Sequence, residues 1–223
     1  MTNLGSPRIA GIGGIVFDLD GVLIDSRECH RQAFEEVLRP LGIVDFDYDQ
    51  YAGWRTLEVF RHCVNRVGRE PVAEEVLAEC SRRKSARARE LVVASGAISQ
   101  ECRPMLFQLS RTFKLALASS GSRHSVESFL AATRTHEAFG SVLSGDDVAH
   151  AKPDPEIFER SMARLGLPPE RCVVVEDAVA GVQAGCAAGA TVVGFSRERT
   201  MGLTSAGAVE VVDSLSELSN LLI

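Results

Sequence analysis

The chain has 223 residues, of which 45% are hydrophobic and 24% charged, and its formal net charge is −6 at pH 7. This composition is typical of a folded globular protein with one large domain, or with a core domain that carries a smaller one, and it excludes a disordered or collagen-like chain. No apolar run reaches the roughly 18 residues of a membrane helix, and an acidic chain is a poor candidate for general nucleic-acid binding.

The N-terminal region and the cysteines favour a cytoplasmic location. Residues 1–14 contain no basic stretch followed by an apolar stretch, which a secretory signal would have. The six cysteines are scattered without a C-x-x-C pair, which fits reduced thiols and not a zinc ribbon or a redox dithiol. The hydrophobic pattern of the sequence contains no exposed apolar stripe, so we expect a monomer without a membrane partner. The acidic net charge predicts that there is no nucleic-acid partner either.

Short apolar runs alternate with helical patterns along most of the chain. The first run, 12–17, is led by glycines and ended by Asp18, which is typical of a buried strand. Further strands are expected at 114–118, 141–143, 172–175, 190–195 and 208–212, and helices at 122–132, 155–165, 178–188 and 214–222. This alternation predicts βαβ units and therefore an α/β fold with a Rossmann-like parallel sheet.

The segment after the first strand breaks this alternation. It contains a helical pattern that begins near Ser26 and ends near Leu38, a long amphipathic stretch at 73–93, and no convincing strand. Residues 27–95 carry 12 basic and 12 acidic side chains, so the acidic excess lies outside them. We therefore predict an all-helical domain at 25–95, inserted into a core domain formed by residues 1–24 and 96–223.

Two aspartates, Asp18 and Asp20, directly follow the first predicted strand and precede Gly21. In parallel α/β sheets, ligands bind beyond the carboxyl ends of the strands. Two carboxylates at such a place repel each other unless a cation or a shared proton offsets the charge. The pair therefore indicates a cation-dependent site, and the simpler alternative is a loop aspartate that caps a helix.

A second group of acids, at 45–49, does not support a metal site. A calcium loop that starts at Asp45 would need glycine at its sixth position and glutamate at its twelfth. The chain has Gln50 and Thr56 there, so we expect a solvent-exposed turn or the entrance of a helix.

Hydroxyl groups and a lysine follow the next two predicted strands. Ser119, Ser120 and Gly121 lie between a strand and a helix, where hydroxyl and backbone N–H groups can hold an anion or simply cap the helix. Lys152 lies before Pro153, in a position that favours extended backbone. It can neutralise a phosphoryl group or a carboxylate cluster, or it can be a solvated lysine.

Glu176 and Asp177 follow the fourth predicted strand and open a helix. They can serve as negative charge at a helix N-terminus or as ligands of a hard cation. Each strand end has a simpler explanation when it is considered alone. Together, the four ends carry the residue types of a site that binds phosphate and Mg²⁺.

Four segments at these strand ends carry a resemblance to a known family. They are F-D-L-D-G-V-L-I-D-S (17–26), L-A-S-S-G-S (117–122), K-P-D-P-E-I-F (152–158) and V-V-V-E-D-A-V-A-G-V-Q-A-G (173–185). In order and spacing the chain resembles the haloacid dehalogenase (HAD) superfamily over nearly its whole length. The resemblance implies that the helical insert is the small mobile cap of that family.

The resemblance also implies roles for the residues at the strand ends. Asp18 would be the nucleophile that becomes an aspartyl phosphate, and Asp20 the general acid and then the base, with a pKa above its usual value. Ser119 and Lys152 would hold the phosphoryl group, with Ser120 and Gly121 beside it. Asp177 would bind Mg²⁺ with the Asp18 carboxylate and the Asp20 backbone carbonyl, and Glu176 would assist.

Within the family, the chain most resembles the branch of β-phosphoglucomutase and many small-molecule phosphatases. His30 and Lys84 fall where the mutase has cap residues that govern substrate entry and phosphate binding; the alternatives are an ordinary helix histidine and a solvated basic face. Arg55 follows Gly53 by two residues, a spacing closer to that of the phosphatases. It is a candidate for the substrate's non-reacting end, with Trp54 as an apolar wall.

The predicted function is that of a Mg²⁺-dependent phosphatase. It would hydrolyse a small organic phosphate monoester through an aspartyl-phosphate intermediate. One alternative is a sugar phosphomutase of the β-phosphoglucomutase type, and another is a non-catalytic binding protein on the same fold. Asp20 favours phosphoryl chemistry over C–halogen cleavage, because the dehalogenases of the family lack this second aspartate.

Overall fold

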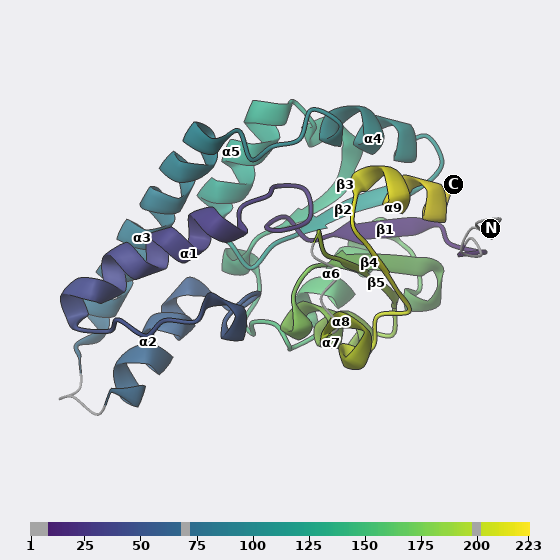
Figure 1. Cartoon of the computed structure of the whole chain (residues 1–223). Coiled ribbons are helices and arrows are strands. Elements are labelled where there is room, and N and C mark those ends of the chain that lie inside the picture. The colour runs from purple at the N-terminus through teal and green to yellow at the C-terminus, as the bar shows by residue number, and fades with distance from the viewer. Residues whose placement is uncertain (1–8, 68–71, 198–201) are drawn as a thin grey trace, which may run out of the picture.

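A computed structural model describes residues 9–67, 72–197 and 202–223. The first eight residues of the predicted core domain, and residues 68–71 of the predicted helical domain, lie outside this part. In the described residues, six strands form one sheet in the order β3-β2-β1-β4-β5-β6, and all its pairs are parallel (Figure 1). The strands are β1 (Gly14–Phe17), β2 (Lys114–Ala118), β3 (Phe139–Leu143), β4 (Cys172–Glu176), β5 (Thr191–Phe195) and β6 (Glu210–Val212). The predicted α/β class is confirmed.

The register of the central strands places their carboxyl ends side by side. Phe17, the last residue of β1, is opposite Leu117 of β2 and Val175 of β4. The residues that follow these three strands therefore come together at one edge of the sheet.

Helices cover both faces of the sheet (Figure 1). One face packs against α4 (Cys102–Leu109), α5 (Arg123–Thr133) and α9 (Leu215–Leu222), and the other against α6 (Glu156–Leu165), α7 (Val179–Ala187) and α8 (Gly202–Ala206). Side chains of β1 alternate between the two layers: Ile15 and Phe17 join the first, and Val16 joins the second. The strands are apolar on both faces because both faces are covered.

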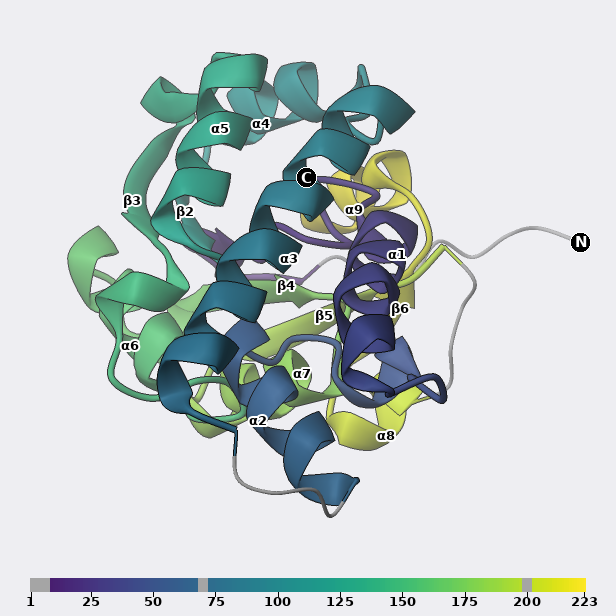
Figure 2. The ribbon, with the colours of Figure 1, turned by 90° about the vertical axis from the view of Figure 1, so that its left-hand side faces the viewer.

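The helices of the inserted segment lie beyond the carboxyl ends of the strands (Figures 1 and 2). They are α1 (Arg27–Leu38), α2 (Thr56–Arg66) and α3 (Glu74–Ser95). They share an apolar cluster of their own, built around Phe34, Phe60 and Leu77, which is separate from the two clusters on the sheet. Short 3₁₀ helices complete the described elements, at Arg39–Leu41, Tyr48–Gln50, His136–Ala138, Gly145–Asp147 and Pro169–Arg171.

Local signals explain where several helices begin and end. Ser122 caps α5 by accepting a hydrogen bond from the backbone N–H of Ser125, and Gly166 ends α6 with a φ of 66°. At the acidic stretch 45–49, Asp47 caps a 3₁₀ helix, which is the helix entrance given as one of the two expectations. Ser26 precedes α1 but does not cap it; its hydroxyl donates to Asp20 Oδ1 at 2.7 Å.

Candidate active site

Five of the predicted site residues meet at the carboxyl edge of the sheet. Asp18 follows β1, Ser119 follows β2, and Lys152 lies in the loop after β3. Glu176 is the last residue of β4, and Asp177 comes directly after it. Four of them are buried, and Asp177 is half-buried. The sheet therefore brings together side chains that lie far apart in the sequence.

The ammonium group of Lys152 lies between two buried carboxylates. Its Nζ atom is 2.6 Å from Asp18 Oδ1 and 2.6 Å from Glu176 Oε1, and it also donates to the Ala118 carbonyl at 3.2 Å. Burial alone would lower the pKa of Lys152, but the charges of the two carboxylates raise it above its usual range. Lys152 is therefore a fixed cation beside Asp18.

Both carboxylate oxygens of Glu176 already have partners. Oε1 accepts from Lys152, and Oε2 accepts from the backbone N–H of Ala178 at 3.1 Å. The carboxylate fits against α7 because Gly181 has no side chain: a Cβ atom there would lie 1.9 Å from the Glu176 carboxyl carbon. In the structure Glu176 thus contacts and positions Lys152, and the metal-assisting role that the resemblance implies for it stays a prediction.

The acids at this edge form a set that fits a divalent cation. Carboxylate oxygens of Asp18, Glu176 and Asp177 lie within 4.8 Å of one another. No described residue donates a hydrogen bond to Asp177, and burial and the charges of Glu176 and Asp18 raise its pKa well above the usual value. This set of three acids offers only oxygen ligands and carries an excess of negative charge. Both properties suit Mg²⁺.

Gly21 leaves room for this carboxylate. It has a φ of +85°, and a Cβ atom on it would lie 1.9 Å from Asp177 Oδ2. The glycine after the two aspartates is therefore needed both for the turn and for the approach of Asp177.

Asp20 is held by two donors from the start of the helical segment. Its Oδ1 accepts from the Ser26 hydroxyl at 2.7 Å and contacts His30 Nε2 at 2.9 Å. Burial would raise the pKa of Asp20, but the charge of His30 and the hydrogen bonds from His30 and Ser26 hold it below its usual value. The expectation of a raised pKa is therefore wrong for this arrangement, in which Asp20 is a carboxylate.

His30 connects Asp20 to Lys84. Lys84 Nζ lies 2.6 Å from His30 Nδ1 and 4.1 Å from the centre of the Phe34 ring. Polar contacts thus run from Asp20 through the two ring nitrogens of His30 to Lys84. Lys84 is only 2% exposed, and burial lowers its pKa to about 7, so it is not a member of a solvated basic face.

A cavity lies between these groups and the helical segment. The core side is formed by Asp18, Asp20, Ser119, Ser120, Gly121 and Asp177, and the other side by His30, Phe34, Tyr48, Tyr51, Gly53, Trp54, Thr56 and Lys84. The wall opposite the acids is thus largely aromatic, and Trp54 contributes to it as predicted. Such a cavity suits a small ester whose charged end faces the core.

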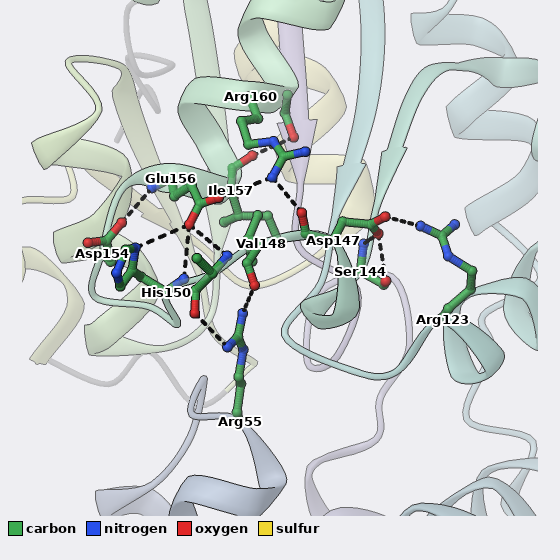
Figure 3. Close-up of polar contacts among 12 residues, drawn as sticks. Arg55, Arg123, Ser144, Asp147, Val148, His150, Asp154, Glu156, Ile157 and Arg160 are labelled. Atoms are coloured by element: carbon green, nitrogen blue, oxygen red, sulfur yellow. Dashed lines mark hydrogen bonds and ion pairs between the residues drawn. The ribbon is translucent and has the colours of Figure 1, made fainter.

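Two residues predicted to bind substrate join the helical segment to the core, and their contact with substrate stays a prediction. Ser120 donates from Oγ to the Gly53 carbonyl at 2.8 Å. Arg55 donates to the carbonyls of Val148 and Ala149 (Figure 3). It is not among the residues that line the cavity. Gly121 lies at the cavity and donates its N–H to Ser119 Oγ at 2.9 Å.

Sequence reasoning overlooked two residues that support the site, Ser26 and Gly181. Ser26 ends the segment that begins at Phe17, and its hydroxyl holds Asp20. Gly181 lies in α7 against the Glu176 carboxylate, whereas Gly185 packs on the sheet, where a Cβ atom on it would lie 2.8 Å from Val192. The five-residue separation of Glu176 and Gly181 was an available signal, because it places Glu176 at the end of β4 and Gly181 in the first turn of α7, the helix that follows.

Comparison with known proteins supports this description. The family model of the haloacid dehalogenase-like hydrolases matches residues 12–189. The chain is 32% identical over 222 residues to protein CbbY of Cereibacter sphaeroides, covering 94% of this chain and 95% of that protein. It is 29% identical over 187 residues to fructose-1-phosphate phosphatase YqaB of Escherichia coli, covering 79% and 92%.

The fold is also similar to that of a solved enzyme structure. The β-phosphoglucomutase of Clostridium difficile matches with a TM-score of 0.80 and 26% identity, over 93% of each chain. These matches bear out the predicted branch of the superfamily. Among the described residues, no helix is long and apolar enough to cross a membrane.

Proposed function

Because the chain belongs to the haloacid dehalogenase-like hydrolase family, we propose that it is a Mg²⁺-dependent phosphatase that hydrolyses a small organic phosphate monoester. The observation that carries this proposal is the position of Asp18. It lies 2.6 Å from a buried lysine and within 4.8 Å of Asp177, a carboxylate to which none of the described residues donates a hydrogen bond. A nucleophile, an anion-binding cation and a cation site are thus adjacent.

Asp18 and Asp177, with the backbone carbonyl of Asp20, would hold the metal ion. When bound, Mg²⁺ offsets the repulsion between a carboxylate and a phosphate dianion. Glu176 is not needed as a ligand in this proposal, because its oxygens hold Lys152 and the Ala178 N–H.

The chemistry has two halves. In the first, an Asp18 oxygen forms a bond to phosphorus and the ester P–O bond breaks, while Asp20 donates a proton to the leaving oxygen. In the second, water attacks phosphorus and releases Asp18, and Asp20 accepts the proton of the water. Lys152 and Ser119 hold the phosphoryl oxygens in both halves.

The protonation state of Asp20 must change during this cycle. In the described arrangement His30 and Ser26 favour its carboxylate, which is the form required for the second half. A bound phosphate dianion beside Asp20 would raise its pKa, because a like charge disfavours ionisation. The arriving substrate would thus create the acid that the first half requires.

Residues 25–95 would act as the cap over this site, and the two parts of the core domain would carry the catalytic groups. The separate apolar cluster of α1, α2 and α3 supports this division. The aromatic wall formed by Phe34, Tyr48 and Trp54 would contact the organic part of the ester and exclude water.

One observation favours transfer of the phosphoryl group to water over transfer to a sugar. A sugar phosphomutase must hold a second phosphate on the same sugar. Among the described residues that line the cavity, the only lysine or arginine is Lys84, and its ammonium group contacts His30. A non-catalytic role is disfavoured because Asp18, Asp20, Lys152 and Asp177 are all present.

Phosphorus NMR on the purified protein tests the proposal. The panel would contain small phosphate monoesters, including fructose 1-phosphate and β-glucose 1-phosphate, each with and without Mg²⁺. Inorganic phosphate that appears only with Mg²⁺ is the expected result. A new phosphoester without free phosphate would indicate a mutase, and no reaction with any ester would contradict the proposal.

A further inference from the structure

Arg55 reaches from the helical segment to the backbone of a core loop. It lies directly before α2, and its guanidinium donates to the carbonyl oxygens of Val148 at 2.5 Å and Ala149 at 3.1 Å (Figure 3). Within the part of the chain that the structure describes, these carbonyls are its polar partners. The contact is therefore directed at a peptide backbone and not at a charged side chain.

The same loop is held on its other side by the core. Glu156, the first residue of α6, accepts hydrogen bonds from the backbone N–H groups of Ala149 and His150, both at 2.9 Å. Arg160 pairs with the other oxygen of Glu156 at 3.0 Å (Figure 3). One arginine from the helical segment and one glutamate from the core thus fix the backbone at 148–150.

This loop leads directly to the lysine of the site. Lys152 is the second residue after His150, and its Nζ atom lies 2.6 Å from Asp18 Oδ1. Two residues of backbone span only about 7 Å, so a displacement at 148–150 is transmitted to Lys152. The backbone that Arg55 contacts and Lys152 therefore belong to one short stretch of chain.

A neighbouring contact ties the same part of the helical segment to a second catalytic loop. Ser120 Oγ donates to the Gly53 carbonyl at 2.8 Å, and Ser120 follows Ser119, which faces the site. The segment 53–55 thus touches the loops that supply Ser119 and Lys152. The Nε atom of Arg55 is buried without an acceptor, which costs free energy and suits a contact that must break when the site opens.

We propose that Arg55 is a positioning residue that couples closure of the helical segment to the placement of Lys152. The inference rests on the proposed function, in which residues 25–95 act as a cap. When the cap closes, Arg55 fixes the carbonyls of Val148 and Ala149 and holds Lys152 against Asp18. When it opens, the loop keeps only its support from Glu156.

A double-mutant cycle with Arg55→Gln and Lys152→Ala tests this coupling. Arg55→Gln is expected to lower kcat by about 10- to 100-fold with little change in KM, because a small misplacement of a catalytic group has effects of that size. The loss should be equal for p-nitrophenyl phosphate and for the best ester of the panel. In the Lys152→Ala background, Arg55→Gln should cause no further loss, because one residue acts through the other.

Two outcomes of the cycle would overturn the proposal. Fully additive losses would show that Arg55 does not act through Lys152. A rise in KM confined to the best ester would instead assign Arg55 to the non-reacting end of the substrate. The control is Arg61→Gln, since Arg61 pairs with Glu74 inside the helical segment and should leave kcat unchanged.

Arg55→Lys adds a geometric test. It keeps the positive charge but not the planar fork that reaches two adjacent carbonyls. Most of the loss in kcat should therefore remain in this variant. Full activity of Arg55→Lys would mean that charge alone is sufficient, and would overturn the assigned contact.

Trp54 provides a measurement that does not depend on turnover. It is the only tryptophan of the chain, it lines the cavity between the helical segment and the core, and it precedes Arg55. Acrylamide should quench its fluorescence more strongly in Arg55→Gln than in the wild type or in Arg61→Gln. Equal quenching would overturn the proposal, whereas failure of the wild type to hydrolyse any ester would count against the proposed function alone.

Discussion

A Cβ atom at Gly181 would lie 1.9 Å from the carboxyl carbon of Glu176, so the backbone of α7 and this carboxylate are in direct contact. The contact directs Glu176 Oε1 toward Lys152, at 2.6 Å. A glycine that touches no substrate therefore helps to fix the lysine of the site.

Gly181→Ala should therefore weaken the positioning of Lys152, although residue 181 does not contact that lysine. The added methyl group must displace the Glu176 carboxylate, which leaves Lys152 with one ionic partner fewer. Overpacking of this kind costs about 1–3 kcal/mol of unfolding free energy, and kcat should fall with it. Urea denaturation and steady-state kinetics would test both, with Gly202→Ala as the control because its nearest contact would be 3.5 Å away. Wild-type kinetics in Gly181→Ala would refute the positioning role of Glu176.

Asp18→Asn should abolish turnover and leave the fold intact. The amide cannot act as the nucleophile that the proposed chemistry requires, and loss of a nucleophile typically costs about 10³-fold or more in kcat. Circular dichroism would verify the fold, and phosphorus NMR would follow the reaction. Retained activity would remove Asp18 from the mechanism.

Most of the core could be predicted from sequence because its strands are short, mostly apolar and bounded by glycine or charged residues. Three of the described α-helices were not predicted, namely α2, α4 and the short α8. Of these, α2 and α4 nevertheless carry the usual helical signal. In α4 the buried residues are Cys102, Met105, Leu106 and Leu109, which follow helical spacing. The early proline of α4, Pro104, is tolerated because the first-turn N–H groups have no partner within the helix.

The site could be predicted in its residues but only partly in its contacts. Asp20 was assigned a raised pKa from its role, whereas Ser26 and His30 lower that pKa through hydrogen bonds that depend on the start of α1. Arg55 was assigned to the substrate from its spacing after Gly53. Its direction depends on how the helical segment lies against the loop at 148–149, and no local pattern encodes that.

Replacement of His30 should move the pH dependence of hydrolysis. His30 holds the pKa of Asp20 below its usual value, so His30→Asn should raise that pKa. In the plot of kcat/KM against pH, the part that reports deprotonation of Asp20 would then shift to higher pH. The value of kcat should also fall, by up to about 10²-fold, which is the lower end of effects on general acid–base catalysis. Kinetics across a pH series would measure both, with the exposed His136→Asn as control. Coincident profiles would refute the link.

Removal of the metal should stop the reaction reversibly. Chelation by EDTA is expected to abolish hydrolysis, and added Mg²⁺ should restore it. Asp177→Asn should raise the Mg²⁺ concentration needed for half-maximal activity by about 10-fold or more, because it removes one charged oxygen ligand. Asp45→Asn, in the solvent-exposed acidic turn, is the matched control. An unchanged Mg²⁺ requirement in Asp177→Asn would argue against this site.

Lys84 should make the stability of the protein depend on pH. Burial lowers its pKa to about 7 from 10.5, so between these values the unfolded chain binds a proton that the folded protein releases. The contribution of Lys84 to the free energy of unfolding should therefore rise from pH 7 to pH 10. Urea denaturation would compare wild type with Lys84→Met, and the exposed Lys114→Met provides the baseline. A wild-type advantage that stays constant over this range would contradict the prediction.

The strand order has a consequence for how the chain is synthesised. β1 is the centre of the sheet, yet its neighbours β2 and β4 begin only at Lys114 and Cys172. An apolar strand thus leaves the ribosome long before its partners exist, whereas the cluster of α1, α2 and α3 is complete by Ser95. We expect the helical segment to fold first and the nascent β1 to need chaperone protection until β4 emerges. Proteolysis of ribosome-stalled chains of increasing length would reveal that order by showing which part becomes resistant first.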